Sequence, residues 1–288
     1  MVKMLAERAP AKINLCLRVT ARRDDGYHEL DSIFLPIDWC DLVRIELRPA
    51  PTAKIGLRCN RPELSDPATN LAARAAAAFA DEYGISTQIA IDLEKRIPAG
   101  AGLGGGSSDA GAVLRMMAVM CSVAVDARLA KIALSLGADV PYFLDPRPAR
   151  VRGIGDRIEP IAAMPALHLV VAVPAIEVPT GKIFRALSPS GFSGEIPSSD
   201  LAAILTGRVS PGMTVNDLAA QAMALYPQIA ELRTLVAAHG ATASAMSGSG
   251  GAVFGIFADR AAAHAAAREV ARAAPSARVV ACETIDSI

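Results

Sequence analysis

Residues 97–111 read IPAGAGLGGGSSDAG, and six of these fifteen positions are glycine. Glycine loses more conformational entropy on folding than any other residue, so a dense glycine cluster is costly unless the backbone needs positive φ or close approach. The following residues, as far as Met120, are strong helix formers, and a serine or aspartate of the SSD triplet is available as the N-cap. The segment therefore predicts a bare loop that leads into the N-terminus of a helix.

A loop of this kind suits an anion, and phosphate is its natural ligand. Free backbone N–H groups can converge on the anion, and the helix macrodipole adds positive charge at the same point. A simple tight turn would need fewer glycines and would leave Ser107, Ser108 and Asp109 without a purpose. We therefore favour a phosphate-binding loop over a packed turn.

Two better-known phosphate motifs fit this segment poorly. Gly100, Gly102 and Gly105 satisfy the dinucleotide pattern G-x-G-x-x-G, but that pattern normally follows a strand directly and is followed by an acidic residue at a strand end. Here Pro98 separates strand from loop, and the acidic residue at a suitable distance, Asp126, begins a predicted helix. The P-loop pattern fails because no lysine precedes Ser107.

Composition limits the remaining classes of protein. Lysine plus arginine and aspartate plus glutamate both total 29 in 288 residues, which argues against a nucleic-acid partner. Five scattered cysteines without a C-x-x-C pair predict neither a disulfide framework nor a zinc site, and they fit a reducing cytoplasm. The apolar run 167–178 is too short for a bilayer, and the N-terminus has no apolar leader region, so we expect no membrane association.

Hydrophobic periodicity predicts an α+β fold. Apolar and polar residues alternate in segments 12–19, 42–48, 54–59 and 88–95, as in half-buried strands of a mostly antiparallel sheet, with Lys12 and Asn14 on one face. Helices are expected at 70–84 and 126–137, each closed by a glycine. The second half should contain strands at 167–174 and 277–284, a Ser/Pro/Gly-rich loop at 188–199 and a helix from about Val215 to His239.

A segment rich in proline, glycine and arginine, residues 144–165, predicts a domain junction. We place the boundary near Ile161, which divides the chain into domains 1–160 and 161–288. A chain of 288 residues is long enough for two domains of ordinary size.

Three segments resemble, in the same order, the three motifs of the GHMP kinases. They are PAKINLCLRV (10–19), PAGAGLGGGSSDAGAVL (98–114) and MSGSGGAVFGIF (246–257). The resemblance implies a two-domain α+β fold: an N-terminal domain with a sheet like that of ribosomal protein S5, a ferredoxin-like C-terminal domain and an active site in the cleft between them. It also implies ATP and Mg²⁺ as cofactors, with the second motif wrapping the ATP phosphates.

Further segments narrow the resemblance to the branch of the family that phosphorylates the 2-hydroxyl of a cytidine diphosphate-linked methylerythritol in the non-mevalonate route to isoprenoids. They are RRDDGYHELDSIF (22–34), NLAARAA (70–76), LGADVPYFL (136–144) and NDLAAQAMALYPQI (216–229). A kinase for another small alcohol, of the mevalonate or homoserine type, and a catalytically silent binding module of the same fold remain alternatives. We expect a small-molecule substrate and a monomer or weak homodimer.

The resemblance assigns roles residue by residue. Asp139 matches the catalytic general base, and Lys12 matches the lysine beside the reacting groups; on the sequence alone, Asp139 could instead cap a helix and Lys12 could be a solvated lysine. The phosphate-binding residues would be Pro98, Ala99, Gly100, Ala101, Gly102, Leu103, Gly104, Gly105, Gly106, Ser107 and Ser108, with Ser107 or Ser108 reaching Mg²⁺.

Substrate contacts follow from the same comparison. Tyr27 and Phe184 would stack on the cytosine, and His28 would hydrogen-bond its edge. The remaining substrate positions would be Asn14, Thr180, Gly248, Ser249 and Gly250. Core packing is the alternative for the two aromatic residues, and a tight entry into a strand is the alternative for the third motif.

Asn70 could contact the nucleotide or simply cap its helix, and the two interpretations have equal weight. Two positions depart from the family pattern. The Leu-Asn pair that is common after the second motif is replaced here in residues 118–120, and Gly251 stands where a small hydroxyl residue or alanine is usual. Neither carries the expected chemistry, although Gly251 removes any side-chain hydroxyl that could contact phosphate there.

Overall fold

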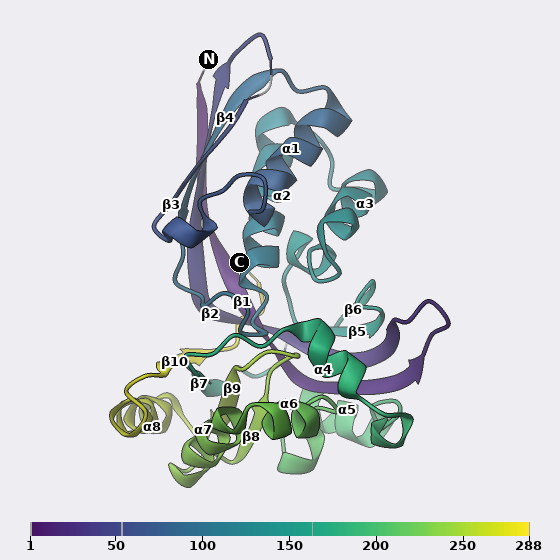
Figure 1. Ribbon diagram of the computed structural model, residues 1–288, viewed down its shortest axis with the longest axis vertical. Helices are drawn as coiled ribbons and strands as arrows, with labels where there is room; N and C mark the ends of the chain where they lie inside the picture. The colour runs from purple at the N-terminus through teal and green to yellow at the C-terminus, as the bar shows by residue number, and fades with distance from the viewer. Residues whose placement is uncertain (1, 53, 163, 288) are drawn as a thin grey trace.

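The computed structural model describes residues 2–52, 54–162 and 164–287, and it contains two β-sheets with helices packed against them (Figure 1). The first sheet has the order β3-β4-β2-β5-β6, with β1 also paired to β2. Its strands are β1 (Lys3–Arg22), β2 (His28–Pro49), β3 (Lys54–Cys59), β4 (Thr87–Glu94), β5 (Ala149–Gly153) and β6 (Arg157–Pro160). All of its pairs are antiparallel except β3 with β4, so the prediction of a mostly antiparallel sheet is confirmed.

Strands β1 and β2 form one long hairpin that passes from the first sheet toward the second half of the molecule (Figure 1). We expected alternating burial in the first of them, but residues 9–17 are buried on both faces. Ile13 and Leu15 pack against the second sheet, while Lys12 and Asn14 face a cavity on the other side. A half-buried pattern was therefore wrong because tertiary packing covers both faces of this strand.

Helices α1 (Leu71–Tyr83), α2 (Gly105–Cys121) and α3 (Ala127–Leu136) lie on one face of the first sheet (Figure 1). The three helices expected in this half of the chain are confirmed. The Asn70 side chain accepts a hydrogen bond from the Ala72 N–H and caps α1, and Gly84 ends the helix in the left-handed conformation. Asp126 caps α3, so this acidic residue has a structural role at a helix start and does not lie at a strand end, where the dinucleotide pattern needs one.

The second sheet has the order β10-β7-β9-β8 and is antiparallel throughout. Its strands are β7 (His168–Val173), β8 (Ala243–Met246), β9 (Val253–Phe257) and β10 (Arg278–Glu283). The helices of this half are α4 (Thr180–Ala186), α5 (Ser198–Leu205), α6 (Ala219–Leu225), α7 (Pro227–Ala238) and α8 (Arg260–Ala273). Short 3₁₀ helices are η1 (Pro62–Leu64), η2 (Pro141–Leu144), η3 (Pro189–Gly191) and η4 (Pro211–Met213).

One helix prediction was wrong in this half. Instead of a continuous helix from Val215 to His239, the chain forms α6 and α7 with a break at Tyr226. Pro227 causes the break, because proline has no N–H to continue the hydrogen-bond ladder and is well tolerated at the first position of a new helix.

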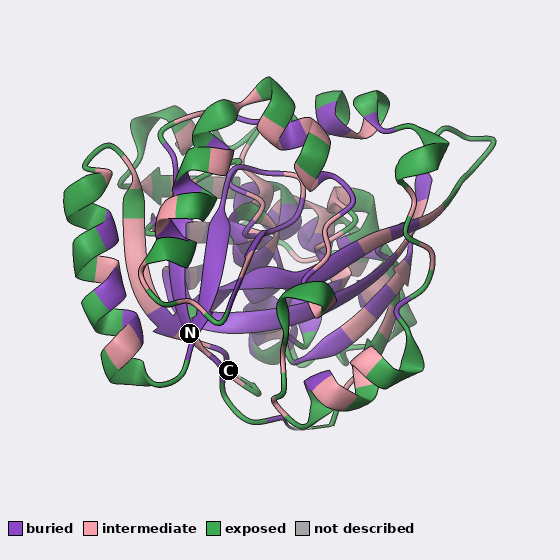
Figure 2. Cartoon of the chain, turned by 90° about the horizontal axis from the view of Figure 1, so that it is seen from below, coloured by how far each residue is buried: buried purple, intermediate pink, exposed green. Residues whose placement is uncertain are grey.

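The two sheets share a hydrophobic core. Ile13 and Leu15 of β1 belong to the same buried cluster as Val171 of β7 and Phe254 of β9. Figure 2 shows buried strands at the centre of the molecule and exposed outer faces on the surrounding helices. We propose the division near Ile161 as a topological one: the first sheet ends at Pro160, and residues 1 and 288, at the ends of the proposed domains, lie outside the described residues.

Within the part of the chain that the structure describes, no helix combines the length and the apolar character that crossing a membrane requires.

Candidate active site

A cavity of about 710 Å³ lies where the long hairpin, the glycine loop and the second half of the chain meet. Twelve of the predicted site residues line it together. They are Lys12, Asn14, Tyr27, His28, Gly102, Gly104, Ser107, Asp139, Thr180, Phe184, Gly248 and Ser249. Residues that lie far apart in the sequence thus contribute to one site.

The glycine loop ends in a helix N-terminus that lacks side-chain caps. Gly104 is the N-cap of α2, with φ of 70°, and the Ser108 N–H donates to its carbonyl over 2.8 Å. The prediction of a serine or aspartate N-cap was therefore wrong, since Ser108 and Asp109 lie inside the first turns of the helix and are buried. The first N–H groups of the helix have no intrahelical partner and are available to an anion.

The space around Gly104 admits no side chain. A Cβ atom there would lie 2.8 Å from the Phe143 ring and 3.2 Å from Cγ of Lys12. Gly102 is equally restricted, because its Cβ would lie 2.4 Å from the Ser247 carbonyl oxygen. Both residues also need positive φ, so glycine is required at these two positions by conformation and by space.

The loop is fastened to β1 and to the third motif by hydrogen bonds. The Lys12 N–H donates to the Leu103 carbonyl at 2.9 Å, and the Ala252 N–H donates to the Ala101 carbonyl at 3.0 Å. Ser247 Oγ accepts from the Asn14 N–H and donates to the Gly102 carbonyl, each over 3.1 Å. These bonds bring the three motifs into one connected assembly.

Lys12 is almost completely buried, with 3% of its surface exposed. Its Nζ donates to Asn14 Oδ1 at 2.6 Å and lies 3.4 Å from Oδ2 of Asp139. It also lies 4.2 Å from the centroid of the Phe34 ring. The interpretation of Lys12 as a solvated strand lysine was therefore wrong.

Asp139 precedes η2 but does not cap it, because the N-cap is Val140 and no side chain makes the capping hydrogen bond. Its carboxylate is about one-third exposed and lies beside the Lys12 ammonium group in the cavity wall. The alternative role as a helix cap was wrong, and the side chain is free to contact a ligand.

Aromatic side chains form part of the cavity wall. The His28 ring contacts Phe184, with centroids 5.3 Å apart, and meets Phe192 edge-on at 5.9 Å. Burial, and the nearby positive charge of Arg22, lower the pKa of His28, so the ring is neutral at neutral pH. Tyr27 is 62% exposed and belongs to the cavity wall, which excludes core packing for it, whereas Phe184 both lines the cavity and packs partly on the core.

The third motif and α4 meet at the cavity through two hydroxyl groups. Thr180 Oγ1 and Ser249 Oγ lie 2.7 Å apart. Asn216 holds the motif from behind, because its Nδ2 donates to the carbonyl groups of Met246 and Gly248, each over 2.8 Å. Gly250 packs so closely on the loop that a Cβ there would lie 2.3 Å from the Ala101 carbonyl carbon.

Several predicted residues do not line the cavity. Pro98, Ala99 and Gly100 form the outer part of the loop, and Gly106 is exposed in the first turn of α2. The other four, Ala101, Leu103, Gly105 and Gly250, are buried. Ser108 is fully buried, so Ser107 is the serine of the pair that faces the cavity. Asn70 caps α1, and its Nδ2 also donates to the Leu64 carbonyl at 2.8 Å.

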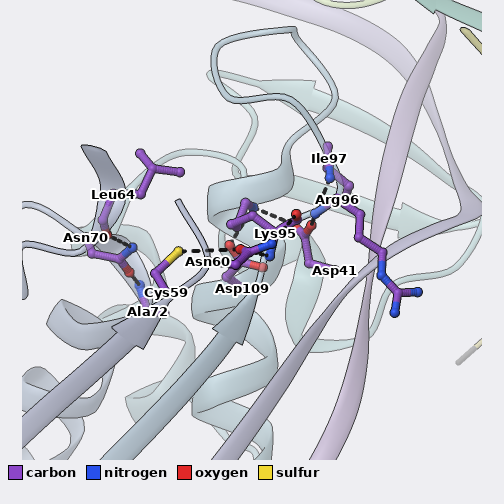
Figure 3. Close-up of polar contacts among 10 residues, drawn as sticks. All are labelled: Asp41, Cys59, Asn60, Leu64, Asn70, Ala72, Lys95, Arg96, Ile97 and Asp109. Atoms are coloured by element: carbon purple, nitrogen blue, oxygen red, sulfur yellow. Dashed lines mark hydrogen bonds and ion pairs between the residues drawn. The ribbon is translucent and has the colours of Figure 1, made fainter. Parts of the chain in front are cut away.

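The sequence patterns missed residues that support the cavity. Ser32 lines the cavity and accepts a hydrogen bond from Nδ2 of Asn14, whereas Ser247 and Asn216 support the third motif from behind the cavity wall. A buried group of Asp41, Lys95 and Asp109 lies at the base of the glycine loop (Figure 3). The one sequence signal for this group is that charged residues, Lys95 and Asp109, stand on either side of the glycine loop.

Two protein-family models match this chain. The model of the GHMP kinases N terminal domain matches residues 70–145, and the model of the GHMP kinases C terminal domain matches residues 201–276. These spans include the glycine loop, Asp139 and the third motif. The chain belongs to the GHMP kinases.

Curated relatives are more specific. A 4-diphosphocytidyl-2-C-methyl-D-erythritol kinase of Anaeromyxobacter sp. (strain K) is 45% identical over 271 residues, covering 91% of this chain and 84% of the relative. The kinase of the same name from Thermus thermophilus is 42% identical over 249 residues, covering 86% of both chains.

Solved structures of GHMP kinases also resemble this chain. The crystal structure of a 4-(cytidine 5'-diphospho)-2C-methyl-D-erythritol kinase matches with a TM-score of 0.84 and 37% identity, covering 98% of this chain and all of that one. The homoserine kinase of Cytophaga hutchinsonii has a TM-score of 0.76 at 18% identity, covering 99% of this chain and 95% of that one, and it shows the fold alone.

Proposed function

We propose that this chain catalyses the ATP-dependent phosphorylation of the 2-hydroxyl group of 4-diphosphocytidyl-2-C-methyl-D-erythritol. The observation that carries the proposal is the Lys12–Asp139 pair, 3.4 Å apart, in the same cavity as an uncapped helix N-terminus. The names of the curated relatives and of the 37% identical structure supply the substrate.

The phosphate end of the cavity fits a nucleoside triphosphate. The first N–H groups of α2 point from a helix N-terminus whose side-chain caps are missing, and the glycines leave room only for backbone beside Lys12. ATP bound there would supply the phosphoryl group, and the Ser107 hydroxyl, which lines the cavity, could provide an oxygen ligand for the accompanying Mg²⁺. The remaining steps belong to the residues of the chain itself.

Asp139 acts as the general base and accepts the proton of the acceptor hydroxyl. Lys12 attracts and orients that carboxylate, and its ammonium charge stabilises the negative charge that develops during transfer. Asn14 holds the ammonium group in place through its 2.6 Å hydrogen bond and is itself held by Ser32. The geometry therefore supports a base and a cation at one reacting hydroxyl.

The opposite end of the cavity recognises the acceptor. Tyr27 and Phe184 present aromatic faces that suit a flat cytosine, and His28 is the neighbouring polar group. Nε2 of His28 has no hydrogen-bond partner among the described residues, and a base edge would provide one. Thr180 and Ser249 line the same cavity and would contact the diphosphate-linked part of the acceptor.

The cellular setting is also proposed. We place the enzyme in the cytoplasm, as a monomer or weak homodimer, in keeping with five free cysteine thiols. Size-exclusion chromatography with light scattering at micromolar concentration tests the oligomeric state, and a stable tetramer would contradict it.

A coupled assay tests the proposed reaction. With ATP and Mg²⁺, the chain should phosphorylate the cytidyl substrate and leave mevalonate and homoserine unchanged. Asp139→Asn should lose most turnover while still binding nucleotide. Phosphorylation of mevalonate or homoserine in place of the cytidyl substrate would overturn the acceptor, and an absence of any transfer would leave a binding module of the same fold.

A further inference from the structure

A buried ionic cluster connects the two ends of the glycine loop. It consists of Asp41 on β2, Lys95 directly after β4 and Asp109 in the second turn of α2 (Figure 3). The three side chains are no more than 5% exposed. None of them lines the cavity, so the reaction described above does not use them directly.

The entrance to the loop is held by Asp41. Its Oδ1 accepts hydrogen bonds from the N–H groups of Arg96 and Ile97, the latter over 2.8 Å. These are the residues immediately before the loop, so a single carboxylate oxygen fixes the direction in which the chain leaves β4. Asn60 fixes Lys95 itself, since its side chain bonds both the N–H and the carbonyl of that residue at 2.8 and 3.2 Å.

The exit from the loop is held by Asp109. Lys95 Nζ donates to Asp109 Oδ2 at 2.7 Å and also donates to Asp41. Its ammonium group therefore ties the residues before the loop to the helix after the loop. Gly105, the first residue of α2, lies against this junction, because a Cβ there would be 2.9 Å from Ile97 and 3.3 Å from Lys95 Nζ.

Stability alone gives a poor reason for such a cluster. Removing two carboxylates and an ammonium group from water is costly, and apolar replacements of buried ion pairs are often neutral or stabilising. Here the cluster contains one more carboxylate than ammonium group, and Asp109 Oδ1 has no hydrogen-bond partner among the described residues. Burial, and the charge of Asp41, raise the pKa of Asp109, in agreement with a position that is electrostatically unfavourable for a carboxylate.

We propose that Asp41, Lys95 and Asp109 are positioning residues that set the geometry of the glycine loop and the α2 N-terminus for the nucleoside triphosphate. The inference rests on the proposed function for its choice of ligand. The cluster fixes both ends of the loop, so the free N–H groups stand at their binding positions before the nucleotide arrives. Loss of one of these contacts leaves the chain folded but displaces the N–H donors at the start of α2.

Two substitutions test the inference. Asp109→Asn keeps the shape and one acceptor but replaces the ionisable carboxyl group that Lys95 contacts with a neutral amide, and Lys95→Met removes the bridge. Each variant is compared with Asp31→Asn as a matched control. Asp31 is 1% exposed, receives two hydrogen bonds from Arg150 and one from the Ile196 N–H, and lies outside the cavity lining.

The measurement separates nucleotide binding from folding. Isothermal titration with Mg²⁺ and a non-hydrolysable ATP analogue should show affinity reduced about tenfold or more in both cluster variants, because small misplacements of binding groups are costly. The KM for ATP should rise equally, whereas the KM for the cytidyl substrate should stay within about twofold of wild type. Asp31→Asn should lose thermal stability without this change in nucleotide affinity.

Three outcomes would overturn the inference. They are folded cluster variants with wild-type affinity for the analogue, an equal rise in both KM values, and a control that loses nucleotide affinity as strongly as the cluster variants. If Lys95→Met fails to fold, Asp109→Asn decides alone. The titration needs no acceptor, so it gives a result even if the cytidyl substrate proves to be wrong.

Discussion

Lys12 illustrates how one residue acquires its function from its surroundings. A buried ammonium group must be compensated, and here the Asn14 amide oxygen, the Phe34 ring and the Asp139 carboxylate surround it. Asn14 lies two residues further along the same strand, whereas Phe34 and Asp139 come from other parts of the chain. The charge is thereby held at the point where the proposed reaction develops negative charge.

Replacing this lysine tests that role. Lys12→Met keeps the length of the side chain and should lower kcat by about 10²- to 10³-fold, since a preorganised charge at the transition state is lost. Stopped-flow or coupled assays measure kcat, and circular dichroism checks the fold. Lys131→Met, at an exposed lysine of α3, is the control and should keep full turnover. A wild-type kcat in the Lys12 variant would remove it from the catalytic machinery.

Gly104 gives a second prediction about a single residue. Gly104→Ala places a Cβ atom on a residue in the left-handed conformation and against the Phe143 ring. We therefore expect a loss of about 1–3 kcal/mol in the free energy of unfolding. Urea unfolding measures this loss. The KM for ATP should also rise, because the α2 N-terminus shifts.

Gly84→Ala is the matched control for Gly104. Gly84 has φ of 63°, and a Cβ there would meet no atom within 4 Å. The control should therefore lose stability through conformation alone and keep its KM for ATP. Equal KM values for ATP in the two variants would show that packing at Gly104 does not position the helix.

Among the elements, helix α2 combines two tasks that the sequence presents as one motif. Its first turn offers free N–H groups to the cavity, and its second turn carries the buried Asp109. An acidic N-cap would have neutralised the helix terminus and satisfied its donors. Placing Asp109 one turn further on keeps the terminus open for an anion.

The position of Asp109 predicts a pH dependence. Burial, together with Asp41 on β2, raises its pKa in the folded state, and Lys95 after β4 only partly opposes this. The folded state thus binds the proton more tightly than the unfolded state. The stability from this group is complete below the ordinary carboxyl range near pH ~4 and is lost as pH rises through the folded pKa.

Asp109→Asn lacks this titration, so its stability relative to wild type should increase as pH rises from about 4 through neutrality. Urea unfolding of both proteins at a series of pH values measures the difference in free energy. The opposite slope, or a difference that does not change with pH, would contradict the raised pKa.

Across the molecule, the two sheets are joined by a common core. Phe254 of β9 is fully buried in the cluster that also contains Ile13 of β1 and Trp39 of β2. A cluster of this kind couples the folding of both halves. The cavity lies at their meeting point, so its shape depends on the same contacts.

We therefore predict a single cooperative unfolding transition. Phe254→Ala should lower the free energy of unfolding by about 3–5 kcal/mol, because it leaves a cavity in the shared core. Trp39 fluorescence, from the first sheet, and far-UV circular dichroism should shift together. Val119→Ala, at a valine that is 70% exposed on α2, should change stability little. Two separate transitions, with Trp39 unaffected by Phe254→Ala, would show independent halves.

Local chemistry explains how much of this could be predicted. Glycine spacing, strand alternation and turn residues act over a few positions, so the loop before α2, the capped helix α1 and the shared face of Lys12 and Asn14 could be inferred directly. The helix break at Tyr226 was not predicted, although Pro227 is a local signal for it. Residues with high helix propensity on both sides of the proline favoured one continuous helix.

Local patterns in the chain were enough to predict the α+β class and a glycine-rich loop at a helix start, and to nominate residues for the proposed phosphoryl transfer. The packing of the elements was needed to show that Lys12 is buried against Asp139, that Ser107 and not Ser108 faces the cavity, and that Lys95 bridges Asp41 and Asp109. The first and the last of these facts join residues on different elements, and the second depends on which side of α2 the rest of the fold covers. Burial and charge pairing between such residues depend on how the elements pack, and no local pattern records that.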